Sequence, residues 1–200
     1  MEFMQVVNER ASVRMFTQEE VNEEDLKKIL NAAIRAPTAF GAEQWFFIVV
    51  KSKELRMKIH ELMLKAHLEY YEKARLKRIS EAGRKKLIER FASGLHLAPI
   101  YIAVYADLTN RVLQDEYKWL EETLAEQSAC AAIENMILAA HSLGYGTCWI
   151  GLALLVENKL KELLKPPENS KLITIISLGK PAGEIKPKPR KQLEEVVKII

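Results

Sequence analysis

The sequence predicts one globular domain in which a β-sheet is covered by helices on both faces. Short apolar runs rich in β-branched residues alternate along the chain with segments whose apolar residues recur at helical spacing. A length of 200 residues is typical of one domain and is enough to bury a sizeable core. A hydrophobic fraction of 48% and a charged fraction of 28% argue against a disordered or fibrous chain.

Two helices are expected near the N-terminus. Residues 2–10 form a short segment with apolar side chains on one side. A second helix starts after Asn22, a preferred capping residue, and three acids at 23–25 suit the positive end of a helix. Pro37 ends this helix because it biases the preceding residue toward an extended conformation. The predicted buried stripe is Leu26, Ile29, Leu30, Ala33 and Ile34.

Four strands are expected. The run at residues 46–50 is continuously apolar, so we predict that it is buried on both faces. The other runs with strand character are 100–106, 147–150 and 172–178.

Helices fill the intervals between these strands. Residues 54–92 read as two helices broken near 80–83, and 156–164 as a short helix. Residues 116–143 form a long helix rich in small residues, which suits packing on several sides. The proline-rich tail after Gly179 ends in a further amphipathic stretch.

Composition and motifs exclude several classes of protein. No apolar run approaches the roughly 18 residues that a membrane-spanning helix needs, and the N-terminus lacks a signal-peptide pattern, so we expect a cytoplasmic protein without a membrane partner. The two cysteines, Cys130 and Cys148, cannot form a disulfide framework or a zinc quartet. The four histidines lack metal-ligand spacing, so we expect no metal. No nucleophile elbow or phosphate-binding P-loop is present, and GYGTCWIG lacks the spacing of a dinucleotide fingerprint.

Two basic clusters at opposite ends of the chain suggest an anion site. In an extended segment Arg10, Ser12 and Arg14 would project to the same side. Lys188 and Arg190 repeat the alternation and are held extended by the prolines at 187 and 189. Guanidinium and hydroxyl groups on one side suit a phosphate. For either cluster alone, an ordinary surface basic group is the preferred interpretation, and the presence of both favours the anion site.

A third basic segment covers residues 73–90. Its acids and its helically spaced leucines and isoleucines favour a solvated helix face, with a nucleic-acid-binding module as the alternative. The net charge of +3 is no nucleic-acid signature, and we expect no nucleic-acid partner.

Four separated segments resemble the nitroreductase family of FMN-dependent oxidoreductases, nearly from end to end of the chain. They are RASVRMF at 10–16, APTAFGAEQWFF at 36–47, MILAAHSLGYGTCWIG at 136–151, and LGKP at 178–181 with KPR at 188–190. The resemblance implies a homodimeric α+β fold with three α/β/α layers and a mainly antiparallel sheet. It also implies a C-terminal arm exchanged with the partner and FMN at each subunit interface.

The resemblance also implies roles for particular residues. Arg10, Ser12, Lys188 and Arg190 would hold the phosphate and ribityl end of FMN, and Arg14 would lie beside the N1–O2 edge of the ring. The partner subunit would supply Pro37, Thr38, Ala39 and Gly41. Backbone amides of Ile150, Gly151 and Leu152 would face the ring.

The second segment departs from the common family pattern. Gly41, Glu43 and Gln44 stand where the pattern has Asn, Gln and Pro. The polar ring contact that relatives draw from the segment after the first strand is unassigned. His67 is one candidate, although an exposed helix histidine is the preferred interpretation.

The predicted function is that of an FMN-dependent NAD(P)H oxidoreductase. Hydride would pass in ping-pong order from NAD(P)H through the flavin N5 to a small-molecule acceptor such as a nitroaromatic or a quinone, with no catalytic side chain. Residues 1–200 would form one domain, with 54–94 as a helical insertion over the active site. Tyr70, Tyr71 and Phe91 would stack on a substrate or pack in the core. A flavin carrier or sensor without turnover is the alternative.

Overall fold

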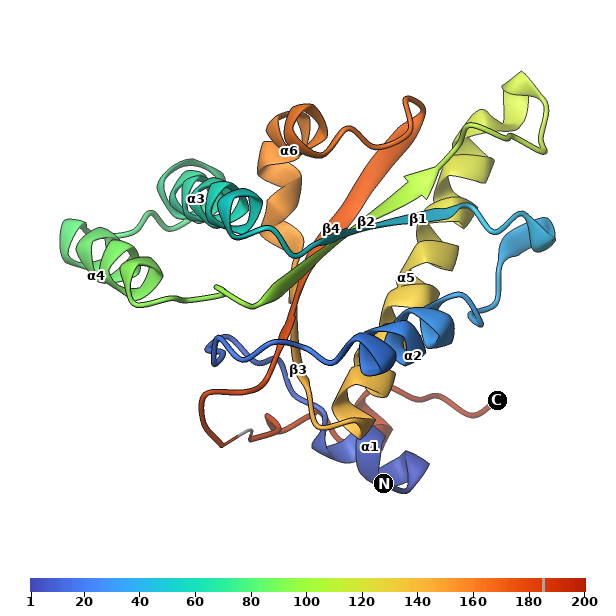
Figure 1. Cartoon of the computed structure of the whole chain (residues 1–200). Coiled ribbons are helices and arrows are strands. Elements are labelled where there is room, and N and C mark those ends of the chain that lie inside the picture. The colour runs from blue at the N-terminus through green and yellow to red at the C-terminus, as the bar shows by residue number, and fades with distance from the viewer. Residues whose placement is uncertain (185) are drawn as a thin grey trace.

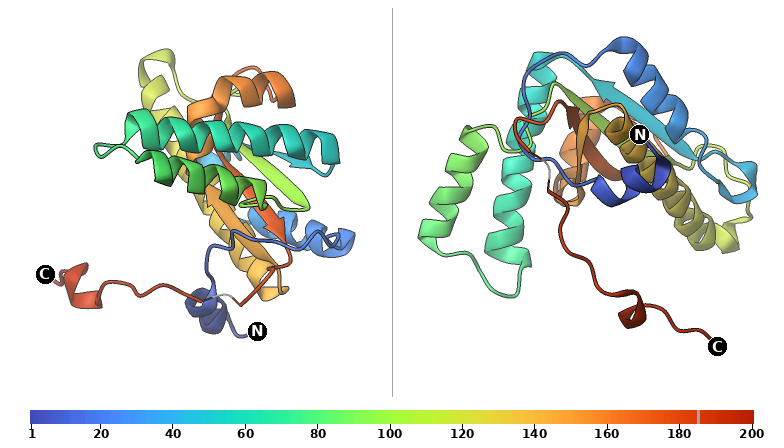
Figure 2. Two further views of the ribbon diagram at one scale, coloured as in Figure 1. Left: turned by 90° about the vertical axis from the view of Figure 1, so that its left-hand side faces the viewer. Right: turned by 90° about the horizontal axis from the view of Figure 1, so that it is seen from below.

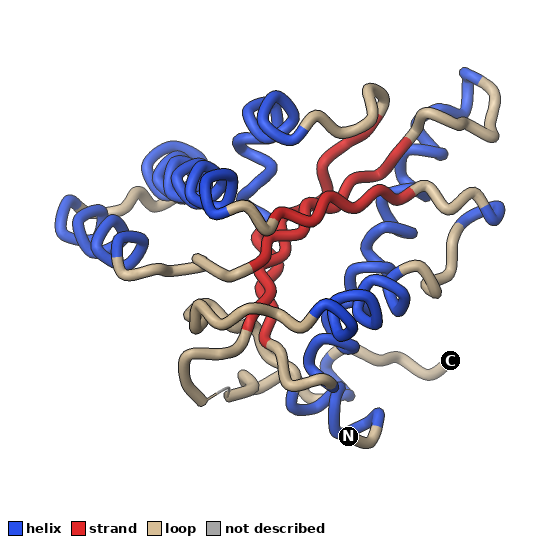
Figure 3. The backbone as a smooth tube through the Cα atoms, viewed as in Figure 1, coloured by secondary structure: helices blue, strands red, loops and turns tan. Residues whose placement is uncertain are grey.

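The computed structural model describes residues 1–184 and 186–200. A twisted sheet lies between two helical layers (Figures 1 and 3). Helices α2 (Glu23–Ala33) and α5 (Lys118–Ser142) cover one face, and α1 (Phe3–Glu9) packs near the end of α5. Helices α3 (Lys53–Glu69), α4 (Glu81–Ala92) and α6 (Glu157–Leu164) lie on the other face. The predicted α+β fold with α/β/α layers is confirmed.

The sheet contains four antiparallel strands in the order β1-β2-β4-β3. Their bounds are Trp45–Val50 for β1, Ile100–Asp107 for β2, Gly146–Ile150 for β3 and Ser170–Gly179 for β4. Each matches a predicted strand within one or two residues. The two long central strands, β2 and β4, carry the shorter ones at their outer edges.

Alternate residues of β2 enter two separate cores. Tyr101, Ala103 and Tyr105 pack toward α3 and α4, whereas the even-numbered residues between them pack toward α2 and α5. All of these residues are buried. Burial on both faces is therefore a property of the central strand.

The prediction that residues 46–50 are buried on both faces is wrong for the single chain. Strand β1 lies at the edge of the sheet, and only Val50 is fully buried in it. The side chain of Phe46 is 40% exposed. An edge strand has one neighbour and less helical cover, so an apolar run there does not guarantee burial.

Capping residues start the helices where the sequence places them. The side chain of Asn22 accepts hydrogen bonds from the backbone amides of Glu24 (2.9 Å) and Asp25 (3.1 Å). The predicted stripe is buried at Leu26, Ile29 and Ala33, but Ile34 is the C-terminal cap and is exposed. The stripe therefore ends one residue early.

The helical region 54–92 is interrupted, but the break spans residues 75–80 and not the predicted 80–83, because residues 81–83 already belong to α4. Helix α3 ends in a π-turn at Tyr70–Ala74, and Ser80 caps α4 through the amide of Gly83 at 3.2 Å. Ile59 and Met63 of α3 and Phe91 of α4 are buried in the core. Within the described residues, no helix is long and apolar enough to cross a membrane.

The C-terminal arm, residues 186–200, runs away from the body of the molecule (Figure 2). The amphipathic stretch predicted at its end contains only a single 3-10 turn, Leu193–Glu195. Large apolar side chains of the arm are exposed in the single chain: Leu193, Val196, Val197, Ile199 and Ile200. With no packing surface beneath it, so short a stretch cannot sustain a longer helix.

Candidate functional site

Residues 10–17 form an extended strap along the outer edge of β3. The amide of Val13 donates to the carbonyl of Thr147 at 2.8 Å, and the amide of Thr17 donates to the carbonyl of Lys180 at 2.9 Å. Val13 and Phe16 enter the core. The strap is therefore held between β3 and the segment that follows β4.

The strap lines a pocket of about 210 Å³. Arg10, Ser12 and Arg14, which were predicted to share a side, all line it together with Ala11, whereas Val13 is buried. The C-terminal arm supplies Lys188 and Arg190, together with Lys186. The structure therefore brings together the two basic clusters from opposite ends of the chain.

The electrostatics of this basic pocket favour an anion. Its lining contains five cationic side chains and one hydroxyl but no carboxylate among the described residues. Lys186 of the lining pairs at 3.1 Å with Glu184, which does not line this pocket. Clustered cations repel one another, and a multivalent anion with several acceptor oxygens relieves that repulsion. An adjoining pocket of about 380 Å³ shares Ser12 and Arg14 and extends past Met15.

The strap lies directly on Gly146, where a side chain has no room. A Cβ atom built on Gly146 would lie 2.5 Å from Cγ2 of Val13 and 2.7 Å from its Cβ. We expect Gly146→Ala to lower the free energy of unfolding by about 1–3 kcal/mol and to shift the strap. Thermal unfolding measures the loss, and Gly183→Ala, which meets nothing within 4 Å, is the control. Equal melting temperatures for the two variants would contradict this packing.

A histidine cluster lies behind Arg14. The amide of His96 donates to the carbonyl of Arg14 at 2.8 Å, and His96 has a left-handed φ of 67°. Burial, aided by the nearby charges of His67 and Arg14, lowers the pKa of His96 to about 3, so its ring is neutral at neutral pH. Within the described residues, no group of three His, Cys, Asp or Glu side chains could hold a metal ion.

Two predictions for the helical region are resolved by this cluster. His67 is half-buried and contacts Phe91 and His96, so its interpretation as an exposed histidine is wrong. Phe91 is only 1% exposed, which confirms packing rather than stacking on a substrate. Tyr70 and Tyr71 are partly exposed and contact each other edge to face. Sequence spacing does not reveal the cluster because His96 belongs to a different segment from His67.

The predicted ring-facing segment lies at the end of β3. Ile150 is buried, Leu152 is half-buried, and Gly151 is exposed with nothing within 4 Å of an added Cβ. These residues do not line the basic pocket. The backbone at Gly151 is therefore open to close approach from outside the chain.

The predicted partner-facing loop contains Pro37, Thr38, Ala39 and Gly41 and packs on the middle of α5. The amide of Ala39 donates to Oγ of Ser128 at 3.2 Å, and the amide of Glu43 donates to Oγ1 of Thr38 at 3.0 Å. Phe40, Gly41 and Glu43 all have left-handed φ angles. Such strain in non-glycine residues indicates that the surroundings dictate the loop conformation. None of the loop residues lines the basic pocket of the same chain.

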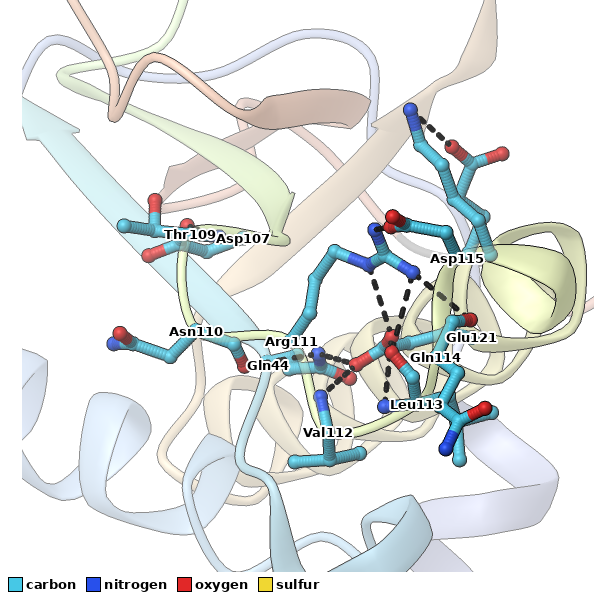
Figure 4. Close-up of polar contacts among 12 residues, drawn as sticks. Gln44, Asp107, Thr109, Asn110, Arg111, Val112, Leu113, Gln114, Asp115 and Glu121 are labelled. Carbon is cyan, nitrogen blue, oxygen red and sulfur yellow. Dashed lines mark hydrogen bonds and ion pairs between the residues drawn. The ribbon is translucent and has the colours of Figure 1, made fainter.

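A polar network that sequence reasoning missed holds the end of this loop (Figure 4). Gln44 is buried, and its Nε2 donates to the carboxylate of Glu121 at 2.8 Å. The same carboxylate accepts from the amides of Val112 and Leu113 and from Nε of Arg111. Gln44 stands where the family pattern has proline, and this difference was the signal available in the sequence. It could not identify Glu121 as the partner, because Glu121 is 77 residues away.

The sequence is similar to those of known proteins over most of its length. The sequence profile described as "Nitroreductase family" matches residues 7–180. A protein of Archaeoglobus fulgidus with a provisional name as an NADH dehydrogenase/NAD(P)H nitroreductase is 31% identical over 92% of this chain and 87% of its own. The Bacillus subtilis FMN reductase [NAD(P)H] is 28% identical over 98% of this chain and 72% of its own.

Solved structures share the fold over the whole chain. A BluB-like flavoprotein from Clostridium difficile is 26% identical, with a TM-score of 0.77, covering 100% of this chain and 99% of its own. A nitroreductase with bound FMN from Bacteroides fragilis is 25% identical, with a TM-score of 0.71 and the same coverage of both chains.

Proposed function

The chain belongs to the nitroreductase family, and on that premise we propose that it is an FMN-dependent oxidoreductase that passes hydride from NAD(P)H to a small-molecule acceptor. The observation that carries this proposal is the basic pocket, in which Arg10, Ser12 and Arg14 meet Lys188 and Arg190. The names of the Bacillus subtilis and Bacteroides fragilis relatives support FMN and NAD(P)H as the ligands.

The residues present fit FMN. Five cations and a hydroxyl complement a phosphate dianion in the sign of their charge and in their hydrogen-bond donors. The open backbone at Gly151 suits a flat ring at close approach. His96 contributes a further sign of a polar ligand nearby, because its Nδ1 is buried without a hydrogen-bond partner among the described residues.

Binding and electrostatics are the work of the protein's own side chains. Arg10, Ser12, Lys188 and Arg190 would hold the phosphate and ribityl end. Bound FMN would supply the redox chemistry by which hydride passes from NAD(P)H to an acceptor such as a nitroaromatic or quinone, in ping-pong order. Arg14 would place a fixed positive charge at the N1–O2 edge, where it would stabilise added electron density.

The proposal includes a homodimer with FMN at the subunit interface. The loop with Pro37, Thr38, Ala39 and Gly41 lies apart from the basic pocket of its own chain, so it would serve the partner's site. Amides of Ile150, Gly151 and Leu152 would face the ring. The exposed apolar side chains of the C-terminal arm support its exchange with the partner. Residues 54–94 would cover the site and select the acceptor.

Substitution of Arg14 tests its proposed contact with FMN. We expect Arg14→Ala to weaken FMN binding by about tenfold and to slow reduction by NAD(P)H, because one charge-assisted contact is lost. Quenching of FMN fluorescence and anaerobic stopped-flow absorbance measure the two effects. The control is Arg35→Ala, which removes an exposed guanidinium after α2. Unchanged affinity and rate in Arg14→Ala would overturn the assignment of Arg14 to the ring edge.

The visible spectrum of the purified protein tests the function itself. We expect a flavin spectrum that bleaches anaerobically when NADPH or NADH is added and recovers with a nitroaromatic or quinone. The nicotinamide that bleaches it faster is the preferred reductant. A flavin that binds but never bleaches would favour a carrier or sensor. A protein that takes up no added FMN would overturn the proposal.

A further inference from the structure

A short run of basic residues lies in the connection between α3 and α4. Residues 73–78, which we call the basic tip, contain Lys73, Arg75, Lys77 and Arg78 but no acid, and all six residues are exposed. In both views of Figure 2 this connection lies at the outer end of the helix pair. The basic tip is therefore open to contact from outside the chain.

Backbone hydrogen bonds hold the basic tip in a defined turn. The amide of Arg75 donates to the carbonyl of Tyr70 at 2.8 Å, and the amide of Ile79 donates to the carbonyl of Tyr71 at 3.0 Å. Ile79 packs against α4, where a Cβ atom added to Gly83 would lie 2.7 Å from its Cγ1. The turn has its shape before any partner binds, which reduces the entropy lost on binding.

The positive charge of the basic tip is not neutralised within the chain. Among the described residues, no ion pair involves any of its four cations, and the adjacent Glu72 pairs instead with Arg84 at 2.6 Å. The guanidinium of Arg75 lies 5.6 Å from the centroid of the Tyr71 ring. The next acid, Glu81, starts α4, where the positive end of the helix suits it. The cations therefore remain available to an external anion.

Leu76 stands in the middle of these cations and is 106% exposed. A single exposed leucine is ordinary by itself. At the centre of a cationic turn, however, it offers an apolar group and several charges to the same partner. An anionic lipid surface takes up both, because cations bind the headgroups while an apolar side chain enters the boundary beneath them. A nucleic acid would bind the cations but leave Leu76 in water.

We propose that the basic tip docks on an anionic membrane surface, with Leu76 in the headgroup boundary and Lys77 and Arg78 on the lipid phosphates. The sequence predicts no membrane partner because no apolar run could span a bilayer, but contact at the surface needs no such run. The inference depends on the turn and its charges and not on the bound cofactor.

Vesicle binding by the full chain tests the inference. We expect the protein to co-sediment with phosphatidylcholine vesicles that contain about one-third phosphatidylglycerol, but not with vesicles of phosphatidylcholine alone. Added salt should weaken the binding because it screens the exposed charges. Absence of binding to the anionic vesicles, or equal binding to both kinds, would overturn the inference.

Two variants separate the apolar contact from the charges. Leu76→Ser should weaken binding to the anionic vesicles by about tenfold. The double variant Lys77→Ser with Arg78→Ser should weaken it by about 20-fold, because each cation near such a surface contributes roughly fivefold. Both variants change only exposed side chains. A loss in the double variant with none in Leu76→Ser would indicate recognition of any polyanion by charge alone, and would overturn the inference.

The C-terminal arm supplies a matched control, because it also combines basic residues with exposed apolar side chains. Ile200 is 107% exposed, as Leu76 is, and Ile200→Ser should leave vesicle binding unchanged. A loss equal to that of Leu76→Ser would assign the contact to the arm and overturn the inference.

A gain of signal complements these losses. Leu76→Trp should keep its vesicle binding, and anionic vesicles of brominated lipid should quench its fluorescence more than that of the wild type. Equal quenching of the two proteins would show that position 76 does not enter the lipid, and would overturn the inference. Flavin binding, measured on the same samples, tests the proposed function separately.

Discussion

Replacing Lys188 and Arg190 together by alanine is expected to weaken FMN binding by about 100-fold and to leave riboflavin binding nearly unchanged. Each cation would contribute one charge-assisted contact to the phosphate, worth at least about 1.5 kcal/mol, or roughly tenfold in affinity. Riboflavin lacks the phosphate and therefore does not use these contacts. Titration of both flavins against the same protein samples, followed by fluorescence quenching, measures the two affinities.

Lys191 provides a matched control for this double variant. It follows Arg190 directly and is exposed, but it does not line the basic pocket. Lys191→Ala should therefore leave both affinities unchanged. If the double variant loses affinity for FMN and riboflavin equally, the C-terminal arm does not bind the phosphate.

Removing the carboxylate of Glu121 is expected to lower the free energy of unfolding by about 3–5 kcal/mol. Glu121 is 0% exposed and accepts four hydrogen bonds, from Gln44, Arg111, Val112 and Leu113 (Figure 4). In Glu121→Ala these donors lose their acceptor, and two of them are backbone amides with no alternative partner in the network. Chemical denaturation at pH 7 measures the loss.

Glu122 is the control for Glu121. It is one residue away on α5 but partly exposed, and it pairs with Lys118 at 3.8 Å. Glu122→Ala should cost less than about 1 kcal/mol, as exposed pairs do. Similar losses in the two variants would contradict the central role of Glu121 in the network.

The contribution of Glu121 should also depend on pH. Burial acts to raise its pKa, but the hydrogen bonds from Val112, Gln44, Leu113 and Arg111 outweigh burial and hold the pKa below its usual 4.5. A lowered pKa in the folded state stabilises the protein above the unfolded-state value and loses that effect as the pH falls through the folded-state value. The stability difference between wild type and Glu121→Ala should therefore shrink below about pH 4.5.

The sequence by itself determined the elements and indicated the two basic clusters, although only the tertiary structure shows that they meet in one pocket. The helical stripe after Asn22 and the apolar runs of the four strands follow from spacing, because burial of one face imposes that spacing on any chain. The alternation of Arg10, Ser12 and Arg14 predicted their shared side, which only needs an extended backbone. The four separated segments also identified the family, which the profile match over residues 7–180 confirms.

Contacts between distant segments were decided only by the tertiary structure. The spacing of apolar residues does not encode the strand order β1-β2-β4-β3, and this order places β1 at an exposed edge of the sheet. Nor does it encode the contact between the strap and the segment after β4. For the same reason the pairing of Gln44 with Glu121, and of His67 with His96, had no signal in the sequence. Periodicity reports the local burial of each element, whereas these contacts depend on how elements far apart in the chain are placed against one another.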